Sequence, residues 1–388
     1  MLVTRLSPAP TAIEIIPGDG SEWISQNSDS ISPFLFIDAH LGVPQKALRK
    51  AYIEAMAVFH RASERRKRGD TSDENDALVA ASTSVILLAN PDHNTALNRR
   101  KELVLRGALR APEELDLCAA ILSEARNSKA SLLWHHRRWL LQYMYPPGVD
   151  IAEEVRQAER LESAAPADAL AREFDIVEKA AEAYPRNYHA WAHRYACLRC
   201  LVMSARTARP GAFVDLLVKE RERMEVWVDR HVGDHTAMQY LCHVIEGMWE
   251  IGLEERNLPR RCDSRTLAHA FAMVRSYPEH EAVWAYLREV CLLVQRWCRE
   301  GSFWEDARAL SALLVAKGEP TQDEEEGRGE DGAVRIRTAR DAAREQSQKA
   351  AILARKFSIW SNIMDGTITV NAQLLSQLRR ESAGASAA

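Results

Sequence analysis

The sequence has no run of about 20 consecutive apolar residues, which argues against a membrane-spanning helix. Residues 1–20 place no long apolar stretch behind basic residues, so we expect no signal peptide. Glycine and proline are sparse, at 17 and 15 of 388 residues, and apolar residues rarely alternate with polar ones. These absences leave little room for strands and favour a chain that is mostly helix.

The sequence also lacks a marked excess of either charge, because 51 basic and 55 acidic residues give a net charge of −4. Nucleic-acid-binding proteins usually carry a strong basic excess, so this balance argues against that class. The local basic run at residues 61–70 is more typical of a solvated helix face. Seven cysteines, odd in number and unclustered, fit reduced thiols buried in helices. We therefore expect a cytoplasmic protein.

Motifs that carry their own chemistry are missing as well. Cys197 and Cys200 have the C-x-x-C spacing, but no second pair and no nearby histidine ligand accompanies them. We interpret both as helix residues. There is no glycine-rich phosphate loop and no Gly-x-Ser-x-Gly elbow. The sequence therefore predicts no metal site and no cofactor in this chain.

What is present is an internal repeat, which decides the architecture. Five segments align without gaps, and each contains one register residue, which is a tryptophan or an apolar substitute. The register residues are Leu97, Trp134, Trp191, Met238 and Trp284. Six residues before them stand Pro91, Ser128, Pro185, Val232 and Pro278. The unequal steps, such as 37 (97 to 134) and 57 (134 to 191), indicate insertions in the connections.

Each repeat has the pattern of a helical hairpin. An apolar stretch such as 77–90 or 114–126 comes first, and proline or a small polar residue ends it. Asn187 is a candidate cap for a second helix, in which residues three, four and seven positions after Trp191 share one face. One hairpin cannot bury its apolar face, so neighbours must stack. We predict an all-α, α-α superhelix of helical hairpins over residues 46–300.

The remaining segments are less patterned. Residues 1–45 are predicted to be an N-terminal extended arm with short candidate strands, and residues 301–316 a terminal helix. Residues 317–332 are acidic, rich in glycine and poor in apolar groups, and predict a disordered linker. Helical patterning returns over 333–380, and residues 381–388 are predicted to be a disordered tail.

Residues that recur at one repeat position are better explained by packing than by catalysis. The tryptophans are expected to be core wedges, and the histidine and arginine that follow are expected to hydrogen-bond between neighbouring units. The residues given this structural role are Trp134, His136, Arg137, Trp191, His193, Arg194 and Trp284.

The repeat also resembles that of a known family. "NYHAWAHR" (187–194) is close to the most recognisable string of protein prenyltransferase α subunits, and "NPDHNTALNRRKEL" (90–103) and "LLWHHRRWLL" (132–141) resemble other units of theirs. The resemblance covers about residues 80–290. The fourth and fifth units and residues 32–44 resemble a divergent branch, the prenyltransferase α-subunit repeat-containing proteins. Leu241 and Leu287 replace the family's arginine, so we expect different packing or partner contacts in those units.

This resemblance implies the α subunit of a third type of protein geranylgeranyltransferase, inactive alone. Such an enzyme moves a geranylgeranyl group from geranylgeranyl diphosphate to a cysteine near a protein's C-terminus. Zinc and the lipid pocket are expected in the β subunit, which the resemblance identifies as that of Rab geranylgeranyltransferase. The alternative is a non-catalytic helical scaffold that has kept the fold.

The resemblance also carries over residue roles at the turn before the third repeat's second helix. It implies that Arg186 stabilises the diphosphate and that Tyr188 forms part of the active-site wall. An exposed turn cation is the other interpretation of Arg186. Asn187 and His189 are interpreted as turn residues and β-subunit contacts. Asp234 and His235 hold the equivalent places of Asn187 and Tyr188 in the fourth unit and could approach the same site.

Overall fold

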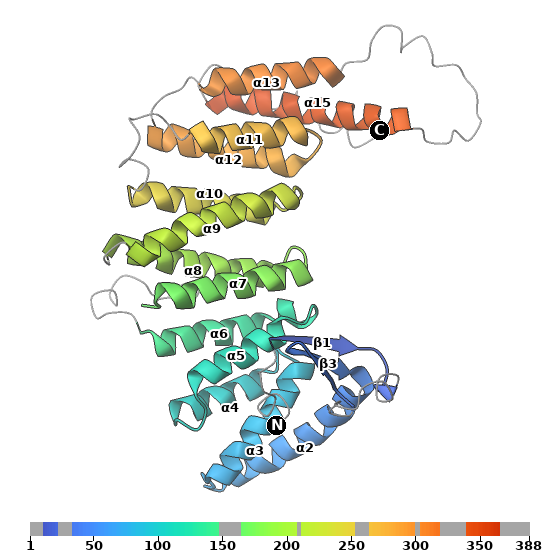
Figure 1. Ribbon diagram of the computed structural model, residues 1–388, viewed down its shortest axis with the longest axis vertical. Helices are drawn as coiled ribbons and strands as arrows, with labels where there is room; N and C mark the ends of the chain where they lie inside the picture. Colours follow the sequence, from blue (N-terminus) through green and yellow to red (C-terminus); the bar gives the residue numbers. More distant parts are fainter. Residues whose placement is uncertain are drawn as a thin grey trace, which may run out of the picture. The chain divides into compact units, whose positions relative to one another are not determined.

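The computed structural model describes residues 11–21, 33–146, 164–207, 211–252, 264–298, 303–318 and 339–364 (Figure 1). These residues are mainly helical, with one three-stranded sheet near the start. The helices form successive antiparallel hairpins, which confirms the predicted all-α helical-repeat class. The chain divides into two compact units, Met1–Leu216 and Leu217–Ala388.

The first unit opens with a small sheet in the strand order β1-β3-β2. β1 (Ala12–Ile16) pairs parallel with β3 (His40–Pro44), and β2 (Leu35–Ile37) pairs antiparallel with β3. Asp38 and Ala39 join β2 to β3 with φ of 49° and 61°, the left-handed conformation of a tight two-residue hairpin. The candidate short strands of the predicted N-terminal arm are therefore present, and they pair with one another into a sheet.

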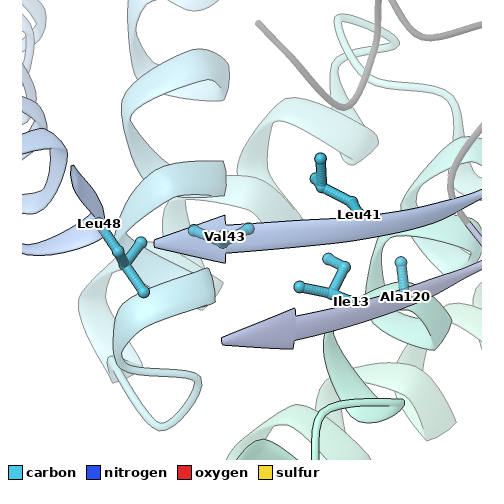
Figure 2. Close-up of a cluster of buried hydrophobic side chains, with 5 residues drawn as sticks. All are labelled: Ile13, Leu41, Val43, Leu48 and Ala120. Atoms are coloured by element: carbon cyan, nitrogen blue, oxygen red, sulfur yellow. The ribbon is translucent and has the colours of Figure 1, made fainter. Parts of the chain in front are cut away.

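This sheet has its own small core, shown in Figure 2. Ile13 of β1 and Leu41 and Val43 of β3 pack with Leu48 and Ala120 from two helices. The backbone N–H of Ile13 also donates to Ser123 Oγ at 2.8 Å. The sheet is thereby fastened to the helical stack through both apolar contact and a hydrogen bond.

The helices of the first unit follow the predicted hairpins. They are α2 (Gln45–Lys67), α3 (Asp73–Ala89), α4 (Asn94–Leu105), α5 (Ala111–Leu122), the 3₁₀ helix η1 (Asn127–Lys129), α6 (Ser131–Met144), α7 (Ala167–Ala183) and α8 (Tyr188–Thr207). The first helices α3, α5 and α7 lie next to one another in one layer, and α4, α6 and α8 form a second layer (Figure 1).

Side-chain caps begin several of these helices. Ser72 Oγ accepts from the backbone N–H of Asn75 at the start of α3, and His93 Nδ1 accepts from that of Ala96 near the start of α4. Such caps satisfy N–H groups that have no partner within the helix. The turns between helices are therefore specified locally by polar residues, while the apolar faces specify which helices pack together.

The second unit continues the hairpin pattern. Its helices are α9 (Gly211–Arg230), α10 (His235–Glu250), α11 (Ser264–Ser276), α12 (Glu281–Cys298), α13 (Phe303–Gly318) and α15 (Ala339–Met364). The first turns of α9 belong to the first unit, which ends at Leu216. α12 packs with α10, α11 and α15, and α13 packs with α15. Among the residues the structure describes, no helix is both long and apolar enough to cross a bilayer.

The end of the chain agrees only partly with the predicted segments. α13 occupies the expected terminal helix and runs on through residues 317 and 318, which the sequence had placed in the linker. α15 lies within 333–380, and its Phe357 packs against Trp284 of the fifth repeat with ring centroids 5.4 Å apart. The linker residues 319–332 and the tail 381–388 lie outside the described residues.

Candidate functional site at the turns between repeats

The six-residue spacing before the register tryptophan corresponds to a hydrogen bond. Trp134 Nε1 donates to the backbone carbonyl of Ser128 at 2.6 Å, and Trp284 Nε1 donates to that of Pro278 at 2.7 Å. Trp134 and Trp284 are buried, as is Trp191. The indole therefore holds the turn against its own second helix, which explains why each turn precedes the tryptophan at a fixed distance.

Arginines that follow the register residues join successive hairpins. Arg100 of α4 donates through Nε and Nη2 to the two oxygens of Glu114 in α5, at 2.6 and 2.5 Å. Arg137 of α6 does the same to Glu173 in α7, at 2.6 and 2.7 Å. All four side chains are at least 96% buried. Each bidentate pair links the second helix of one repeat to the first helix of the next.

Histidines complete these pairs. His136 Nε2 lies 3.1 Å from Glu114 Oε1, and His193 Nε2 lies 2.9 Å from Glu173 Oε2. Burial lowers the pKa of both histidines, and this outweighs the opposing effect of the nearby carboxylate. Each histidine is therefore neutral at pH 7 and donates through Nε2–H. We call Arg100–Glu114–His136 and Arg137–Glu173–His193 the two clamps.

The carboxylates of the clamps stay ionised although they are buried. Burial alone would raise the pKa of Glu114, but the charge of Arg100 and hydrogen bonds from His136 and Arg100 lower it to about 2. The pKa of Glu173 is lowered to about 2 by the corresponding partners. The clamps are thus buried ion pairs. The contacts of His136, Arg137 and His193 agree with the structural role predicted for these three residues, whereas Arg100 was not predicted.

Arg194 holds the corresponding position in the third repeat, three residues after Trp191. Its guanidinium lies 5.4 Å from the ring centroid of Phe174 and 5.7 Å from that of Trp191. Nη1 also donates to the backbone carbonyl of Phe174 at 3.4 Å. The residue is 1% exposed, so it is part of the packed interior.

In the fourth and fifth repeats, tyrosines stand where the clamps have histidine. Tyr240 OH donates to Glu220 at 2.8 Å, and Tyr286 OH lies 2.9 Å from His269 Nδ1. Leu241, in the arginine position, is fully buried. The packing of these two repeats therefore differs as expected. A tyrosine replaces the histidine of the clamp, and a leucine replaces its arginine.

Sequence reasoning missed the carboxylates of these contacts. Glu114, Glu173 and Glu220 lie 20, 18 and 18 residues before Trp134, Trp191 and Met238. A charged residue on an amphipathic helix is usually solvated, so the sequence alone did not predict that these three are buried. The near-constant spacing was the signal that could have identified them as buried partners of the repeat.

The turn over residues 184–187, which we call the Arg186 turn, and the start of α8 carry the residues to which the resemblance assigns catalytic roles. Arg186 has φ of 60°, a left-handed backbone conformation that residues other than glycine rarely adopt. Its side chain is exposed, and Tyr188, the first residue of α8, is 70% exposed. His189 is half-buried, with its ring centroid 5.2 Å from that of Tyr188.

Asn187 has a different environment from its neighbours, since it is 1% exposed. Its Nδ2 donates to the backbone carbonyl of Ser128 at 2.8 Å, and its Oδ1 accepts from the backbone N–H of Ala190 at 3.1 Å. The predicted cap of the second helix is present. Its interpretation as a β-subunit contact is corrected, because the buried amide is engaged within the chain.

Asp234 and His235 lie in the second unit, at the start of α10. Asp234 Oδ1 accepts from the backbone N–H groups of Thr236 and Ala237, both at 3.1 Å. His235 is exposed. Asp234 is thus a helix cap, and the proposal that it approaches the Arg186 turn stays a prediction.

One group of potential metal ligands lies in the first clamp, where atoms of Glu114, Cys118 and His136 are within 4.8 Å of one another. Both oxygens of Glu114 already face the guanidinium of Arg100, which disfavours a second cation. Burial also raises the pKa of the Cys118 thiol far above its usual range, so the thiol is protonated in the metal-free chain. Cys197 and Cys200 are buried in α8.

The geometry defines a class of two-layer helical-repeat proteins, and comparisons with known proteins identify the family. Residues 111–144 and 170–201, which cover α5–α6 and most of α7–α8, match the protein prenyltransferase alpha subunit repeat. Protein prenyltransferase alpha subunit repeat-containing protein 1 of Danio rerio is 30% identical over 303 residues, covering 69% of this chain and 66% of that protein. The Homo sapiens protein of that name is 26% identical over 324 residues, covering 73% and 74%.

A shorter match covers 31% of this chain and 19% of geranylgeranyl transferase type-2 subunit alpha of Mus musculus, with 32% identity over 130 residues. The chain belongs to the protein prenyltransferase alpha subunit repeat family.

Proposed function

We propose that the chain is the α subunit of a heterodimeric protein prenyltransferase and is inactive alone. In this proposal the heterodimer transfers a geranylgeranyl group from geranylgeranyl diphosphate to a cysteine of a protein substrate. Family membership supports the α-subunit role. The single observation that carries the proposal is the Arg186 turn, which presents a cation and a tyrosine to solvent on a rigid support.

The turn is hard to explain by folding alone. A left-handed residue that is not glycine costs about 1–2 kcal/mol, and glycine would fill the place of Arg186 at less cost. Tyr188 likewise adds little to the core, because 70% of its surface remains exposed. Asn187 holds both residues in place from a buried position. An exposed guanidinium and phenol on a fixed turn are suited to contact a bound ligand.

The proposed chemistry assigns this turn to the leaving group. A substrate thiolate forms a bond to the first carbon of the prenyl chain, and the carbon–oxygen bond to the diphosphate breaks. The electron pair of that bond goes to the diphosphate, whose negative charge grows in the transition state. A guanidinium that contacts it there lowers the barrier. Arg186 takes this role, and Tyr188 lines the site beside it.

The partner is proposed to be a β subunit that supplies the lipid pocket and a zinc ion, which would hold the substrate cysteine as a thiolate. The similarity to geranylgeranyl transferase type-2 subunit alpha favours the β subunit of that enzyme, Rab geranylgeranyltransferase. It also favours a geranylgeranyl over a farnesyl donor.

A helical scaffold without an enzyme role is the second candidate. It is favoured by the second unit, where leucines replace the arginines of the repeat and Asp234 is a helix cap. A scaffold would retain the clamps because they hold the hairpins together, but it would have no use for an exposed Arg186.

Co-expression with the β subunit, followed by pull-down and size exclusion, tests the α-subunit role. A one-to-one complex is expected, and it should prenylate candidate proteins that end in cysteines. Arg186→Ala should slow transfer and leave complex formation unchanged. A helical, monodisperse chain that binds no β subunit would instead support the scaffold.

A further inference from the structure

Lys129 holds the same place in its repeat as Arg186 does in the next one. Each lies five residues before a register tryptophan, Lys129 before Trp134 and Arg186 before Trp191. Lys129 ends the 3₁₀ helix η1 at the turn before α6, and its side chain is exposed. The repeat therefore places one exposed cation on each of two consecutive turns.

These two turns are joined directly. Asn187 Nδ2 donates to both the carbonyl oxygen and Oγ of Ser128, at 2.8 and 3.3 Å. Ser128 precedes Lys129 in the chain, and Asn187 follows Arg186. Because Ser128 and Asn187 are almost completely buried, the hydrogen bonds fix the backbones that carry the two cations next to each other.

The lysine side chain is directed toward the Arg186 turn. Lys129 Nζ lies 4.9 Å from the ring centroid of Tyr184, the first residue of that turn. A contact with an aromatic face orients the ammonium group and leaves its charge in place. Within the part of the chain that the structure describes, neither Lys129 nor Arg186 forms a salt bridge. Two cations without a salt-bridge partner therefore lie on neighbouring turns of the surface.

We propose that Lys129 and Arg186 bind one diphosphate group together, so that Lys129 is a second diphosphate-binding residue. This inference rests on the proposed function and extends it, because the donor's diphosphate is the anion that would reach this turn. A diphosphate spreads its charge over two phosphoryl groups, and one cation can contact only part of it. The planar guanidinium fork of Arg186 and the point charge of Lys129 suit different oxygens of such a group.

The pair also suits the direction of the reaction. When the carbon–oxygen bond of the donor breaks, the released pyrophosphate carries more charge than the bound donor did. Two cations stabilise that product and the transition state leading to it more than they stabilise the donor. Inorganic pyrophosphate is consequently a suitable probe of the pair, independent of the protein substrate.

Binding of inorganic pyrophosphate to the full chain in its complex with the β subunit, measured by calorimetry, tests the proposal. Lys129→Gln and Arg186→Gln should each weaken binding about tenfold, since each removes a charged hydrogen-bond donor. Lys179→Gln is the matched control. Lys179 is an exposed lysine of α7 that lines a surface hollow with Thr11 and Asp116, so its loss should change binding less than twofold.

The outcomes separate the inference from the function. Pyrophosphate binding that survives Lys129→Gln but falls in Arg186→Gln overturns the role of Lys129 and leaves the proposed function intact. Loss of β-subunit affinity in Lys129→Gln, with pyrophosphate affinity unchanged, also overturns it and makes Lys129 an interface residue. A wild-type complex that binds pyrophosphate through both residues but transfers no prenyl group supports the pair and rejects the function. A chain that forms no complex and binds no pyrophosphate rejects both.

Discussion

The amide of Asn187 donates to the backbone carbonyl of Ser128 at 2.8 Å, across 59 positions of sequence. The same carbonyl accepts from the indole of Trp134 at 2.6 Å. One oxygen atom therefore joins the turn of the second repeat to its own helix and to the turn of the third repeat. Through this contact, the position of Arg186 depends on residues of the preceding hairpin.

Asn187→Ser should separate the two roles of this side chain. Serine can still cap α8, because its hydroxyl can accept from the N–H of Ala190, but it has no amide to reach Ser128. We expect the free energy of unfolding to fall by about 1–2 kcal/mol, the usual cost of a lost buried hydrogen bond and an unmatched group. Prenyl transfer by the heterodimer should fall further than this loss of stability explains, because the turn is no longer fixed.

Chemical denaturation and initial rates at saturating donor would measure the two effects. Ser72→Ala is a suitable control, because it removes a helix cap of α3 whose contacts do not involve the Arg186 turn. Transfer that falls equally in the two variants would show that Asn187 acts only through stability.

Arg186→Asn should lower activity without lowering stability. Asparagine tolerates the left-handed conformation better than arginine does, so the φ of 60° becomes less costly. We expect the free energy of unfolding to stay the same or to rise by up to about 1 kcal/mol. The rate of prenyl transfer should fall at least about tenfold, since a charged contact to the diphosphate is lost.

Thermal unfolding of the chain and single-turnover transfer by the heterodimer would test this trade of stability against activity. Arg186→Lys keeps the charge and should retain more activity than Arg186→Asn. If the Arg186→Asn heterodimer transfers the prenyl group as fast as the wild type, the charge of Arg186 has no part in the reaction.

The second clamp should be more sensitive to the loss of one partner than to the loss of both. Glu173→Gln leaves the buried guanidinium of Arg137 without its counter-charge and should destabilise the chain by about 3 kcal/mol or more. The double variant Arg137→Met with Glu173→Leu removes both charges and fills their space with apolar groups. It should lose less stability than Glu173→Gln, about 1–2 kcal/mol, because removing a buried ion pair is often close to neutral but leaves His193 Nε2–H without its acceptor.

Urea unfolding of the wild type, Arg137→Met, Glu173→Leu and the variant with both substitutions forms a complete cycle for this pair. The exposed pair Arg110–Glu113 provides a comparison, and its variants should change stability by less than about 1 kcal/mol. If the losses of unfolding free energy in the two single variants add up to the loss in the double variant, Arg137 and Glu173 are not energetically coupled.

The sequence predicted the helices well because their signals are local. The 3.6-residue pattern around Trp191 and the breaks at Pro185 and Pro278 fall where helices begin and end in the structure. The sheet was harder to predict because Ala12 pairs with His40, and pairing between distant short strands leaves no periodic signal. Two candidate strands were visible in the sequence, but their contact was not.

Some residues of the candidate site could also be predicted from the sequence, and their contacts could not. The resemblance indicated Arg186 and Tyr188, and the structure shows that both are exposed on one turn. The partner of Asn187 could not be predicted, because Ser128 approaches it only after two hairpins have stacked. The role of Glu173 could not be predicted either, because its ion pair with Arg137 forms only when α6 and α7 pack together.

The clamps also predict how stability depends on pH. Burial lowers the pKa of His193 in the folded chain below its usual 6.5, so below pH 6.5 the unfolded state binds more protons. The contribution of His193 to stability is therefore complete above pH 6.5 and declines as pH falls below it. Glu173 has its pKa lowered from 4.5 to about 2, so its contribution is complete above pH 4.5 and is lost as pH falls toward 2.

His193→Gln should therefore change the first of these two declines and not the second. The wild type should lose up to about 1.4 kcal/mol per pH unit for each buried histidine as pH falls below 6.5, and the variant should lose less. Glutamine keeps an N–H donor for Glu173 but does not titrate. His235→Gln, on an exposed histidine, is the control and should follow the wild type. Urea unfolding at pH values from 7.5 to 4.5 would measure the slopes. Equal slopes for His193→Gln and wild type would show that folding does not lower the pKa of His193.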